Sequence, residues 1–316
     1  MVLKRDIAVA YAPAAVGNVA VGFDLLGHAI EAPGDVVSVR YTDHDQVVID
    51  EITGVAGELP LLAEENSAGA ALLAMREGLG LVGGFSVRIK KGIPSGSGMG
   101  GSGASAVAAV FAANALLDEP LAVADLLPFA LAGEAAATGA APIDNVAPQL
   151  LGGLRLAHPD GGTPIALPVP QGLQCVLVHP DCKIETRRSR AGLNEHIPLT
   201  LVTRQSALLA AFVSACHLGD IDLLSRSLRD VLIEPQRSFD IPGFADVQRA
   251  AMKNSALGCS LSGSGPSVFA WCRRSDAKTI AAVMRAAFER SGLASSVYIS
   301  AIDAPGVRLL ENDNNL

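Results

Sequence analysis

Aromatic side chains are scarce in this chain of 316 residues, which holds only 9 Phe, 3 Tyr and 1 Trp. The core must therefore be built from Ala, Val, Leu and Ile, which favours closely packed helices and sheets. Charged residues are also few, at 18%, whereas apolar residues make up 50%. This balance excludes an intrinsically disordered chain, which requires low hydrophobicity and high net charge.

Runs of basic residues are absent as well. The chain has 24 Lys and Arg against 32 Asp and Glu, a formal net charge of −8. Nucleic acids and anionic membrane surfaces repel such a chain, so we expect neither as a partner. Any anion-binding site must be local, made from backbone N–H groups or a few arginines.

Cysteine and histidine show no pattern typical of disulfides or metal sites. The five cysteines are scattered without a C-x-x-C pair, and the six histidines show no H-x-x-x-H spacing. This usage fits a reducing compartment and predicts no structural transition metal. The N-terminus is similar to a signal peptide, but Asp6, Pro13, Gly17 and Asn18 interrupt its apolar region. We therefore expect a cytoplasmic protein.

One uncharged run, residues 92–117, needs a separate explanation. Only its last 14 residues, ASAVAAVFAANALL, are strongly apolar. A bilayer-spanning helix needs about 20 such residues. The run therefore predicts a buried helix.

Hydrophobic patterning divides the rest of the chain into strands and helices. Val- and Ile-rich or alternating runs predict strands at 7–12, 36–41, 46–52, 85–91, 154–157, 174–180, 266–272 and 296–302. Helical periodicity predicts helices at 66–80, 121–137, 200–217, 220–232, 243–253 and 276–291. Strands mixed with helices in both halves predict an α+β protein of two α/β domains. The Pro- and Gly-rich stretch 159–172 suggests a boundary, giving domains 1–166 and 167–316.

The most informative segment is IPSGSGMGGSGAS, residues 93–105, which lies between a predicted strand and the buried helix. Its glycines let backbone N–H groups approach a ligand closely, and the helix start adds a positive dipole end. No acidic residue lies between Lys91 and Asp118 to repel an anion. A flexible linker would not lead at once into an apolar helix. The segment therefore predicts a phosphate-binding loop.

Two common phosphate loops fit this segment poorly. It is not a Walker A loop, because no G-K-[ST] follows. Gly96, Gly98 and Gly101 match G-x-G-x-x-G, but a dinucleotide fold needs a further strand after the helix. Here residues 118–120 end the helix and another helix is predicted to follow. A nicotinamide-dependent oxidoreductase remains only as an alternative.

The loop instead resembles the second motif of the galactokinase–homoserine kinase–mevalonate kinase–phosphomevalonate kinase (GHMP) superfamily. APAAVGNVAVGFDLLGHAI (12–30) and LSGSGPSVFA (261–270) resemble the first and third motifs, in the expected order. Residues 134–153, 180–193 and 233–244 are similar to the homoserine kinase family specifically. The resemblance covers nearly the whole chain. It implies ATP-dependent phosphorylation of the side-chain hydroxyl of L-homoserine, giving O-phospho-L-homoserine and ADP, in threonine biosynthesis.

The resemblance also implies a fold and partners. The expected architecture is an N-terminal domain like ribosomal protein S5 domain 2, which carries the loop, and a C-terminal ferredoxin-like domain. The active site would lie between them. ATP would be the co-substrate and Mg²⁺ the metal, and the family implies a homodimer.

Site residues follow from the same resemblance. ATP would bind Pro94, Ser95, Gly96, Ser97, Gly98, Met99, Gly100, Gly101 and Ser102. Mg²⁺ would bind Ser102 and Glu134. The surroundings of Glu134 agree, because a lone carboxylate in the apolar stretch 129–143 is costly unless it is paired or liganded.

The implied homoserine site consists of Asn18, Asp24, Asn145, Thr186, Arg190 and Arg237. The two arginines would bind the substrate carboxylate and Asp24 its ammonium group. Asn18 and Asn145 would lie around the reacting hydroxyl. From the residues alone, a solvated basic turn is the more common explanation for Arg190, since Arg187 and Arg188 precede it.

Several positions depart from the family pattern. Pro142 stands where a histidine is usual, and Met99, Gly101 and Gly103 replace Leu, Ser and Ala. The missing histidine leaves open a kinase for another small alcohol, and a non-catalytic relative is a further alternative. An amide cannot act as a base, so Asn145 leaves Asp144 as the candidate general base. We expect Asn145, Asp144 and Glu134 to serve catalysis mainly by positioning and charge stabilisation.

Overall fold

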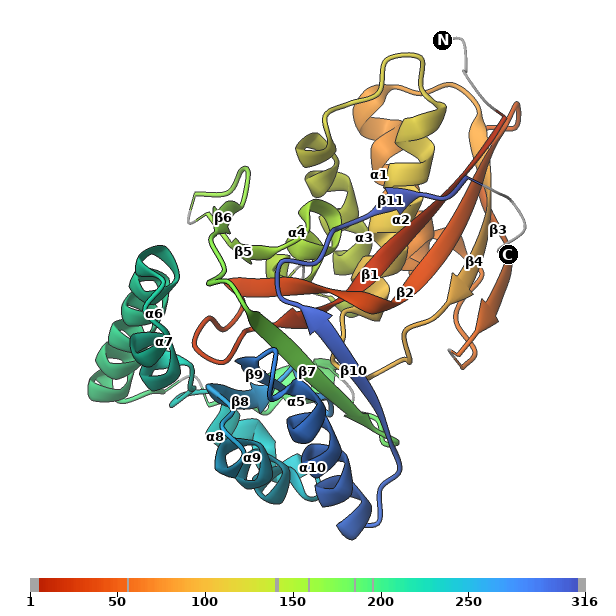
Figure 1. The fold of residues 1–316 in the computed structure, drawn as a ribbon. Helices are drawn as coiled ribbons and strands as arrows, with labels where there is room; N and C mark the ends of the chain where they lie inside the picture. Colours follow the sequence, from red (N-terminus) through yellow and green to blue (C-terminus); the bar gives the residue numbers. More distant parts are fainter. Residues whose placement is uncertain are drawn as a thin grey trace.

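Two sheets with their covering helices make up the molecule (Figure 1). A computed structural model describes residues 6–55, 57–139, 142–158, 160–184, 186–194 and 196–311, with only the backbone described at 138 and 186–188. Mixed strands and helices confirm the α+β prediction.

The first sheet belongs mainly to the N-terminal half. Its main path runs β11 (Arg308–Leu309), β1 (Ile7–Gly17), β2 (Leu26–Thr42), β4 (Gly84–Lys91) and β3 (Val47–Gly54). β5 (Leu154–Leu156) pairs with β2, and β6 (Ile165–Leu167) pairs with β5. Among the described strands of this sheet, only β3 and β4 pair in parallel.

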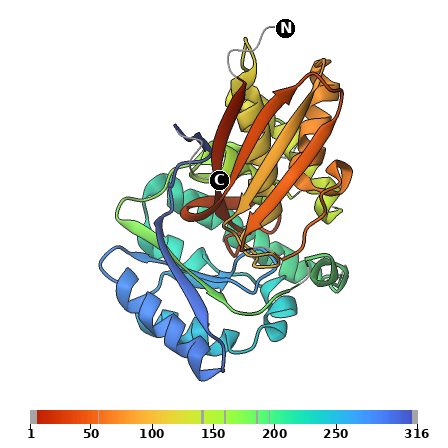
Figure 2. The same cartoon turned by 90° about the vertical axis from the view of Figure 1, so that its right-hand side faces the viewer.

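Helices cover one face of this sheet. They are α1 (Ser67–Leu79), preceded by the 3₁₀ turn η1 (Ala63–Glu65), α2 (Gly101–Leu116), and α3 (Leu127–Thr138), preceded by η2 (Val123–Leu126). Figure 2 shows the red and orange strands in front and these helices behind them. α2 is buried around most of its circumference, as predicted, because its many alanines let α1, α3 and the sheet pack closely.

The second sheet is antiparallel and belongs to the C-terminal half. Its order is β10 (Ser295–Ala301), β7 (Leu173–Pro180), β9 (Val268–Arg273) and β8 (Gly258–Leu261). α9 (Phe244–Lys253) and α10 (Ala277–Arg290) pack on this sheet and bury a second apolar cluster.

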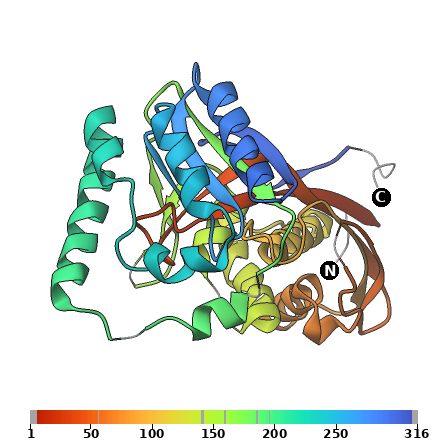
Figure 3. The same cartoon turned by 90° about the horizontal axis from the view of Figure 1, so that it is seen from below.

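The remaining helices lie around the junction of the two halves. They are α4 (Ile143–Leu151), α5 (Thr186–Ala191), α6 (Leu199–Leu218), α7 (Ile221–Ser227), α8 (Glu234–Arg237) and the 3₁₀ turn η3 (Ser238–Asp240). α6 and α7 form a pair at the margin of the molecule (Figure 3). Among the described residues, α6 is the one helix long and apolar enough to cross a membrane, which is weak evidence by itself. All five cysteines are free thiols.

Most predicted elements exist, and the misses have local causes. β2 begins ten residues before the predicted strand, because Gly27, Pro33 and Gly34 are residues that usually interrupt strands. α4 was not predicted, since it contains Pro148 and follows Pro142. The helix predicted at 220–232 ends at Ser227. Asp230 ends it by accepting hydrogen bonds from the N–H groups of the next turn.

Candidate active site

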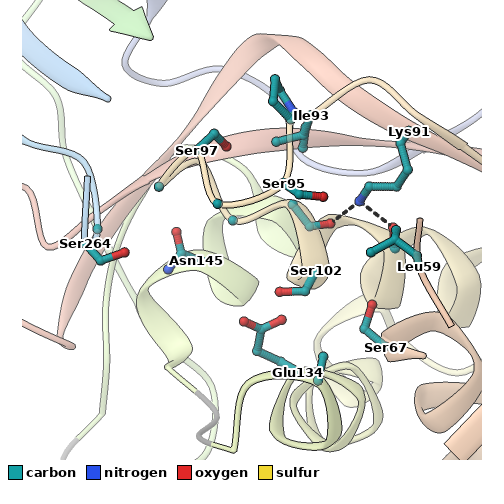
Figure 4. Close-up of a pocket in the computed structure, with 18 of the residues that line it drawn as sticks. Leu59, Ser67, Lys91, Ile93, Ser95, Ser97, Ser102, Glu134, Asn145 and Ser264 are labelled. Atoms are coloured by element: carbon teal, nitrogen blue, oxygen red, sulfur yellow. Dashed lines mark hydrogen bonds between the residues drawn. The ribbon is translucent and has the colours of Figure 1, made fainter. Parts of the chain in front are cut away.

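A cavity of about 580 Å³ lies between the glycine-rich loop, the start of α1 and α3. Residues 93–98 and 100–102 of the loop form one wall, and residues 59–60 and 65–67 contribute the opposite end. Glu134 of α3 faces the loop across the cavity (Figure 4). The cavity therefore places the predicted phosphate loop and the predicted metal ligand opposite each other.

The loop has the geometry of an anion-binding cradle. Gly96, Gly98 and Gly100 have positive φ angles of 66°, 75° and 70°, whereas Ser97 and Met99 between them do not. Such alternation turns successive N–H groups toward one side. Glycine is required because other residues rarely adopt positive φ.

The start of α2 extends this cradle. α2 begins at Gly101, and no side chain caps its first N–H groups. Uncapped N–H groups and the helix dipole both favour a bound anion. The backbone at 96–103 thus supplies hydrogen-bond donors and partial positive charge to a chain of net charge −8.

Ser102 and Glu134 form the oxygen-rich part of the cavity. Glu134 is only 4% exposed. Burial raises the pKa of its carboxyl, against the lowering effects of a Ser102 hydrogen bond and the Lys91 charge. Mg²⁺ takes few protein ligands, keeping waters and substrate phosphates as the others. A hydroxyl and a carboxylate beside a phosphate cradle fit that ion, and no cluster of three metal-binding side chains occurs in the described ranges.

A buried ion pair fixes the entry to the loop. The Lys91 ammonium donates to the Asp35 carboxylate, to the Gly101 carbonyl at 2.6 Å and to Ser105 Oγ at 2.9 Å. Asp35 Oδ1 accepts from the N–H groups of Gly92 and Ile93 at 3.0 and 3.2 Å. The sequence analysis missed this pair, although the alternation in 85–91 places Lys91 on the buried face. The sequence signal for this pair was a lysine at a position where the alternation of the strand predicts a buried apolar side chain.

A second cluster of charged groups lies beside the third motif. Arg190 Nη2 donates to both carboxylate oxygens of Asp24, at 2.7 and 2.8 Å. The guanidinium groups of Arg190 and Arg237 lie 5.5 and 5.3 Å from the centre of the Phe23 ring. Phe23, which the sequence analysis did not single out, is therefore a platform for both cations.

Arg237 is held at the edge of this cluster. Its Nη1 donates to the Gly263 carbonyl at 3.2 Å, which also accepts from Asn18 Nδ2 at 2.9 Å. Arg237 is 5% exposed, and its Nε has no acceptor among the described residues. Burial and the neighbouring Arg190 charge lower its pKa. An anionic ligand would accept a hydrogen bond from this Nε and would reduce the repulsion between the two guanidinium groups.

Asn145 connects the two regions. It lines the cavity, and its Oδ1 is buried without a donor in the described part of the chain. Asp144 accepts hydrogen bonds from the Asn18 N–H at 2.9 Å and from Asn145 Nδ2 at 3.2 Å. Burial, together with the nearby Asp24 charge, raises the pKa of Asp144 to about 7. Asp144 is thus a buried support of Asn145 and Asn18 and is not among the cavity-lining residues.

The structure brings most of the predicted site residues together. The loop residues line the cavity except Met99, whose side chain is buried in the core. Pro142 lines the cavity at the position where the family pattern has histidine. Asn18, Asp24, Arg190 and Arg237 form the charged cluster. The side chain of Thr186 lies outside the described residues. Lys183, which the sequence analysis did not select, also lines the cavity.

Comparison with known proteins indicates the same family as the sequence motifs. The GHMP kinases N terminal domain model matches residues 66–153, and the GHMP kinases C terminal model matches 210–290. A homoserine kinase from Xylella fastidiosa (strain M12) is 50% identical over 302 residues, covering 95% of this chain and 93% of the relative. One from Chloroherpeton thalassium is 40% identical, covering 95% of this chain and 98% of the relative.

Solved structures agree. The crystal structure of homoserine kinase from Cytophaga hutchinsonii aligns with a TM-score of 0.93 and 41% identity, covering 97% of this chain and 98% of that one. A Lactococcus lactis galactokinase structure aligns with a TM-score of 0.69 at 14% identity, covering 97% and 96%, which shows the shared fold alone. The fold and both matched domains make the chain a member of the GHMP kinases. Within them it belongs to the homoserine kinase family, and the predicted resemblance is confirmed.

Proposed function

We propose that this chain transfers the γ-phosphoryl group of ATP to the side-chain hydroxyl of L-homoserine. The products are O-phospho-L-homoserine and ADP, and the reaction belongs to threonine biosynthesis. One observation carries the proposal: Asn145 lies between the phosphate cradle and the charged cluster. That cluster offers a carboxylate and guanidinium groups, which are the partners that the ammonium and carboxylate groups of an amino acid require. Relatives at 50% identity named homoserine kinase support the choice of substrate.

The cradle would hold the nucleotide. ATP phosphates accept hydrogen bonds from the converging N–H groups of loop 96–100 and from the first turn of α2. Ser102 and Glu134 would hold Mg²⁺, which neutralises phosphate charge as the group transfers. Lys183 lies on the same cavity wall and adds positive charge there.

The charged cluster would hold the amino-acid end of homoserine. A zwitterion carries one carboxylate and one ammonium group, which can replace the two halves of the Asp24–Arg190 pair. The carboxylate would bind Arg190 and the free Nε of Arg237, and the ammonium group would bind Asp24. Asn18 spans this cluster and the third-motif turn through its hydrogen bonds to Asp24 N–H and Gly263.

Asn145 would orient the reacting hydroxyl. The hydroxyl oxygen attacks the γ-phosphorus while the bond between that phosphorus and the β–γ bridging oxygen breaks, and the hydroxyl proton passes to an oxygen of the transferred phosphoryl group and then to solvent. Asp144 accepts a hydrogen bond from the Asn145 Nδ2, which leaves the Asn145 Oδ1 as the acceptor that the reacting hydroxyl would use. We infer a reaction that depends on positioning and charge stabilisation. A role for Asp144 as general base stays a prediction, as do the roles of Thr186 and Met99.

Three further expectations have no direct support in the structure. The homodimer, the cytoplasmic location and the boundary between residues 166 and 167 stay predictions. Sedimentation analysis of the purified chain measures the oligomeric state directly.

A coupled ADP-release assay with MgATP and L-homoserine tests the proposal, using Glu134→Gln beside the wild type. Glu289→Gln, at an exposed helical ion pair, is the matched control. We expect homoserine-dependent ADP release that falls at least about a hundred-fold in Glu134→Gln, because the carboxylate for Mg²⁺ is lost. The control should retain wild-type turnover.

Three outcomes would contradict the proposal or one of its parts. Turnover with mevalonate or galactose but not with homoserine would assign the site to another small alcohol and implicate Pro142. ADP binding without turnover of any alcohol would indicate a non-catalytic relative. Equal activity of Glu134→Gln and the wild type would remove Glu134 from the metal site.

A further inference from the structure

Six consecutive carbonyl oxygens of the glycine-rich loop accept hydrogen bonds from groups outside the loop. Backbone N–H groups donate to three of them: Ile184 N to Gly96 at 3.2 Å, Ser267 N to Ser97 at 3.2 Å and Ala15 N to Met99 at 3.1 Å. Two serine hydroxyls also donate, Ser267 Oγ to Ser97 at 2.6 Å and Ser262 Oγ to Gly98 at 2.7 Å. At the end of the loop, Gln149 Nε2 donates to Gly100 at 2.8 Å and Lys91 Nζ to Gly101 at 2.6 Å. The donors come from β1, β4 and α4, from the turn between β8 and β9, and from the segment between β7 and α5.

This arrangement determines where the loop N–H groups point. In a trans peptide the C=O of one residue and the N–H of the next lie in one plane and point in opposite directions. Carbonyls held from outside the loop therefore turn the N–H groups toward the cavity. A cradle fixed in this way need not be reordered when an anion binds, which lowers the entropic cost of binding.

Four of the donors are side chains, and all four are buried. They are Ser262, Ser267, Gln149 and Lys91. Ser267 is itself fixed, because its hydroxyl donates to Ser97 and lies 3.1 Å from His179 Nδ1, which donates to it in the tautomer with a proton on Nδ1. None of these hydroxyl or amide groups needs to touch the nucleotide in order to orient the loop.

Gln149 and Gly100 are matched sterically as well as by hydrogen bonding. A Cβ at residue 100 would lie only 2.7 Å from Gln149 Nε2. The amide can therefore reach the Gly100 carbonyl only because residue 100 has no side chain. The pair links α4, which carries Asn145, to the last turn of the loop before α2.

We propose that Ser262, Ser267 and Gln149 are positioning residues that hold the phosphate loop in its nucleotide-binding conformation through its carbonyl groups. The inference rests on the proposed function only in assigning the loop to a nucleotide. A residue that merely stabilises the fold would lower the free energy of unfolding without selectively weakening nucleotide binding, so the two roles are separable.

The test measures ADP binding by calorimetry, without any alcohol, for Ser262→Ala, Ser267→Ala and Gln149→Met. Each variant removes the side-chain donor of one loop carbonyl. Ser262→Ala takes from the Gly98 carbonyl the one donor it has among the described residues, whereas the Ser97 carbonyl keeps Ser267 N and the Gly100 carbonyl keeps Ala104 N at 3.0 Å. We therefore expect about ten-fold weaker ADP binding in Ser262→Ala and a smaller but measurable loss in the other two variants. The KM for homoserine should stay within about two-fold, since the charged cluster is unchanged. Ser225→Ala is the matched control, because its hydroxyl donates to the Leu257 carbonyl at 2.9 Å, outside the loop.

Three results would overturn the inference: ADP affinities equal to that of the wild type, weakened ADP binding of the same size in Ser225→Ala, or a wild type that binds no ADP. Gln149→Met acts from a different element than the two serines, so a single variant that fails to fold leaves the test intact. A wild type that binds ADP but does not phosphorylate homoserine overturns the proposed function and not this inference.

Discussion

At the scale of the residue, the charged cluster brings together side chains that lie far apart in the sequence. Asp24 and Arg190 satisfy each other across 166 positions of sequence. Asp24 has a φ of 58°, a conformation that Asp and Asn tolerate better than most residues. Asn at this position therefore removes the charge while preserving the backbone.

Asp24→Asn should raise the KM for homoserine by about ten- to a hundred-fold, because hydrogen bonds to charged groups contribute roughly 1.5–3 kcal/mol. The KM for ATP should change by less than about two-fold, since the phosphate cradle lies on other residues. Steady-state kinetics with each substrate varied in turn measures both values. Asp246→Asn, in an exposed helical ion pair, serves as control. An unchanged homoserine KM would remove Asp24 from the ammonium site.

At the scale of the element, the loop and α2 act together. Gly98 illustrates the constraint on the loop, because a Cβ there would lie 2.5 Å from the Ser262 carbonyl and 2.6 Å from that of Gly265. Both contacts are with backbone of the third motif, which cannot give way easily. The φ of 75° adds strain for any residue with a side chain.

Gly98→Ala should therefore weaken ADP binding more than about ten-fold and also lower stability. Gly80→Ala is a matched control, since Gly80 has a φ of 60° but nothing within 4 Å of an added Cβ. The control should cost only about 1 kcal/mol of stability, from backbone strain, and leave ADP binding unchanged. Calorimetric titration with ADP and urea denaturation measure the two effects. Equal ADP affinity in both variants would show that the contact with the third motif is dispensable.

At the scale of the whole molecule, one buried pair joins the two sheets. The single tryptophan, Trp271 of β9, donates its Nε1–H to His28 Nε2 of β2 at 3.2 Å. His28 Nδ1 lies 2.8 Å from the Ala29 carbonyl, so this nitrogen carries the proton and Nε2 accepts. Burial lowers the pKa of His28 to about 4. A second proton, on His28 Nε2, would place an N–H donor directly opposite the N–H donor of Trp271.

The pair predicts a pH-dependent part of the stability. The unfolded chain takes up a proton on His28 near pH 6.5, whereas the folded chain does so only near pH 4. The free energy of unfolding therefore falls as the pH falls through this interval. Relative to His28→Gln, the wild type should lose about 2 kcal/mol between about pH 7.5 and about pH 5. Urea denaturation followed by Trp271 fluorescence measures the difference.

The comparison with a variant is necessary here. The raised pKa values of Glu134 and Asp144 act in the opposite direction, because these buried carboxyls bind protons more tightly in the folded state. Their effect cancels between wild type and His28→Gln. Parallel pH profiles for the two proteins would show that His28 is not buried in its neutral form.

The sequence determined those features that depend on neighbours along the chain. The order G-x-G-x-G at 96–100 dictates positive φ at alternate residues, and the apolar run after it dictates a buried helix. The phosphate loop, α2 and most strands were therefore predictable. The resemblance of three spaced motifs added the family and the roles proposed for Glu134, Asp24 and Arg237.

Only the tertiary structure decided which groups support those residues. Lys91 and Asp35 are 56 positions apart and Ser267 and Ser97 are 170 apart, so no local pattern relates them. The Phe23 platform depends equally on two arginines that come from α5 and α8. Hydrogen bonds and ring contacts need distances of a few ångströms, and only the folding of both sheets around one cavity brings these atoms so close.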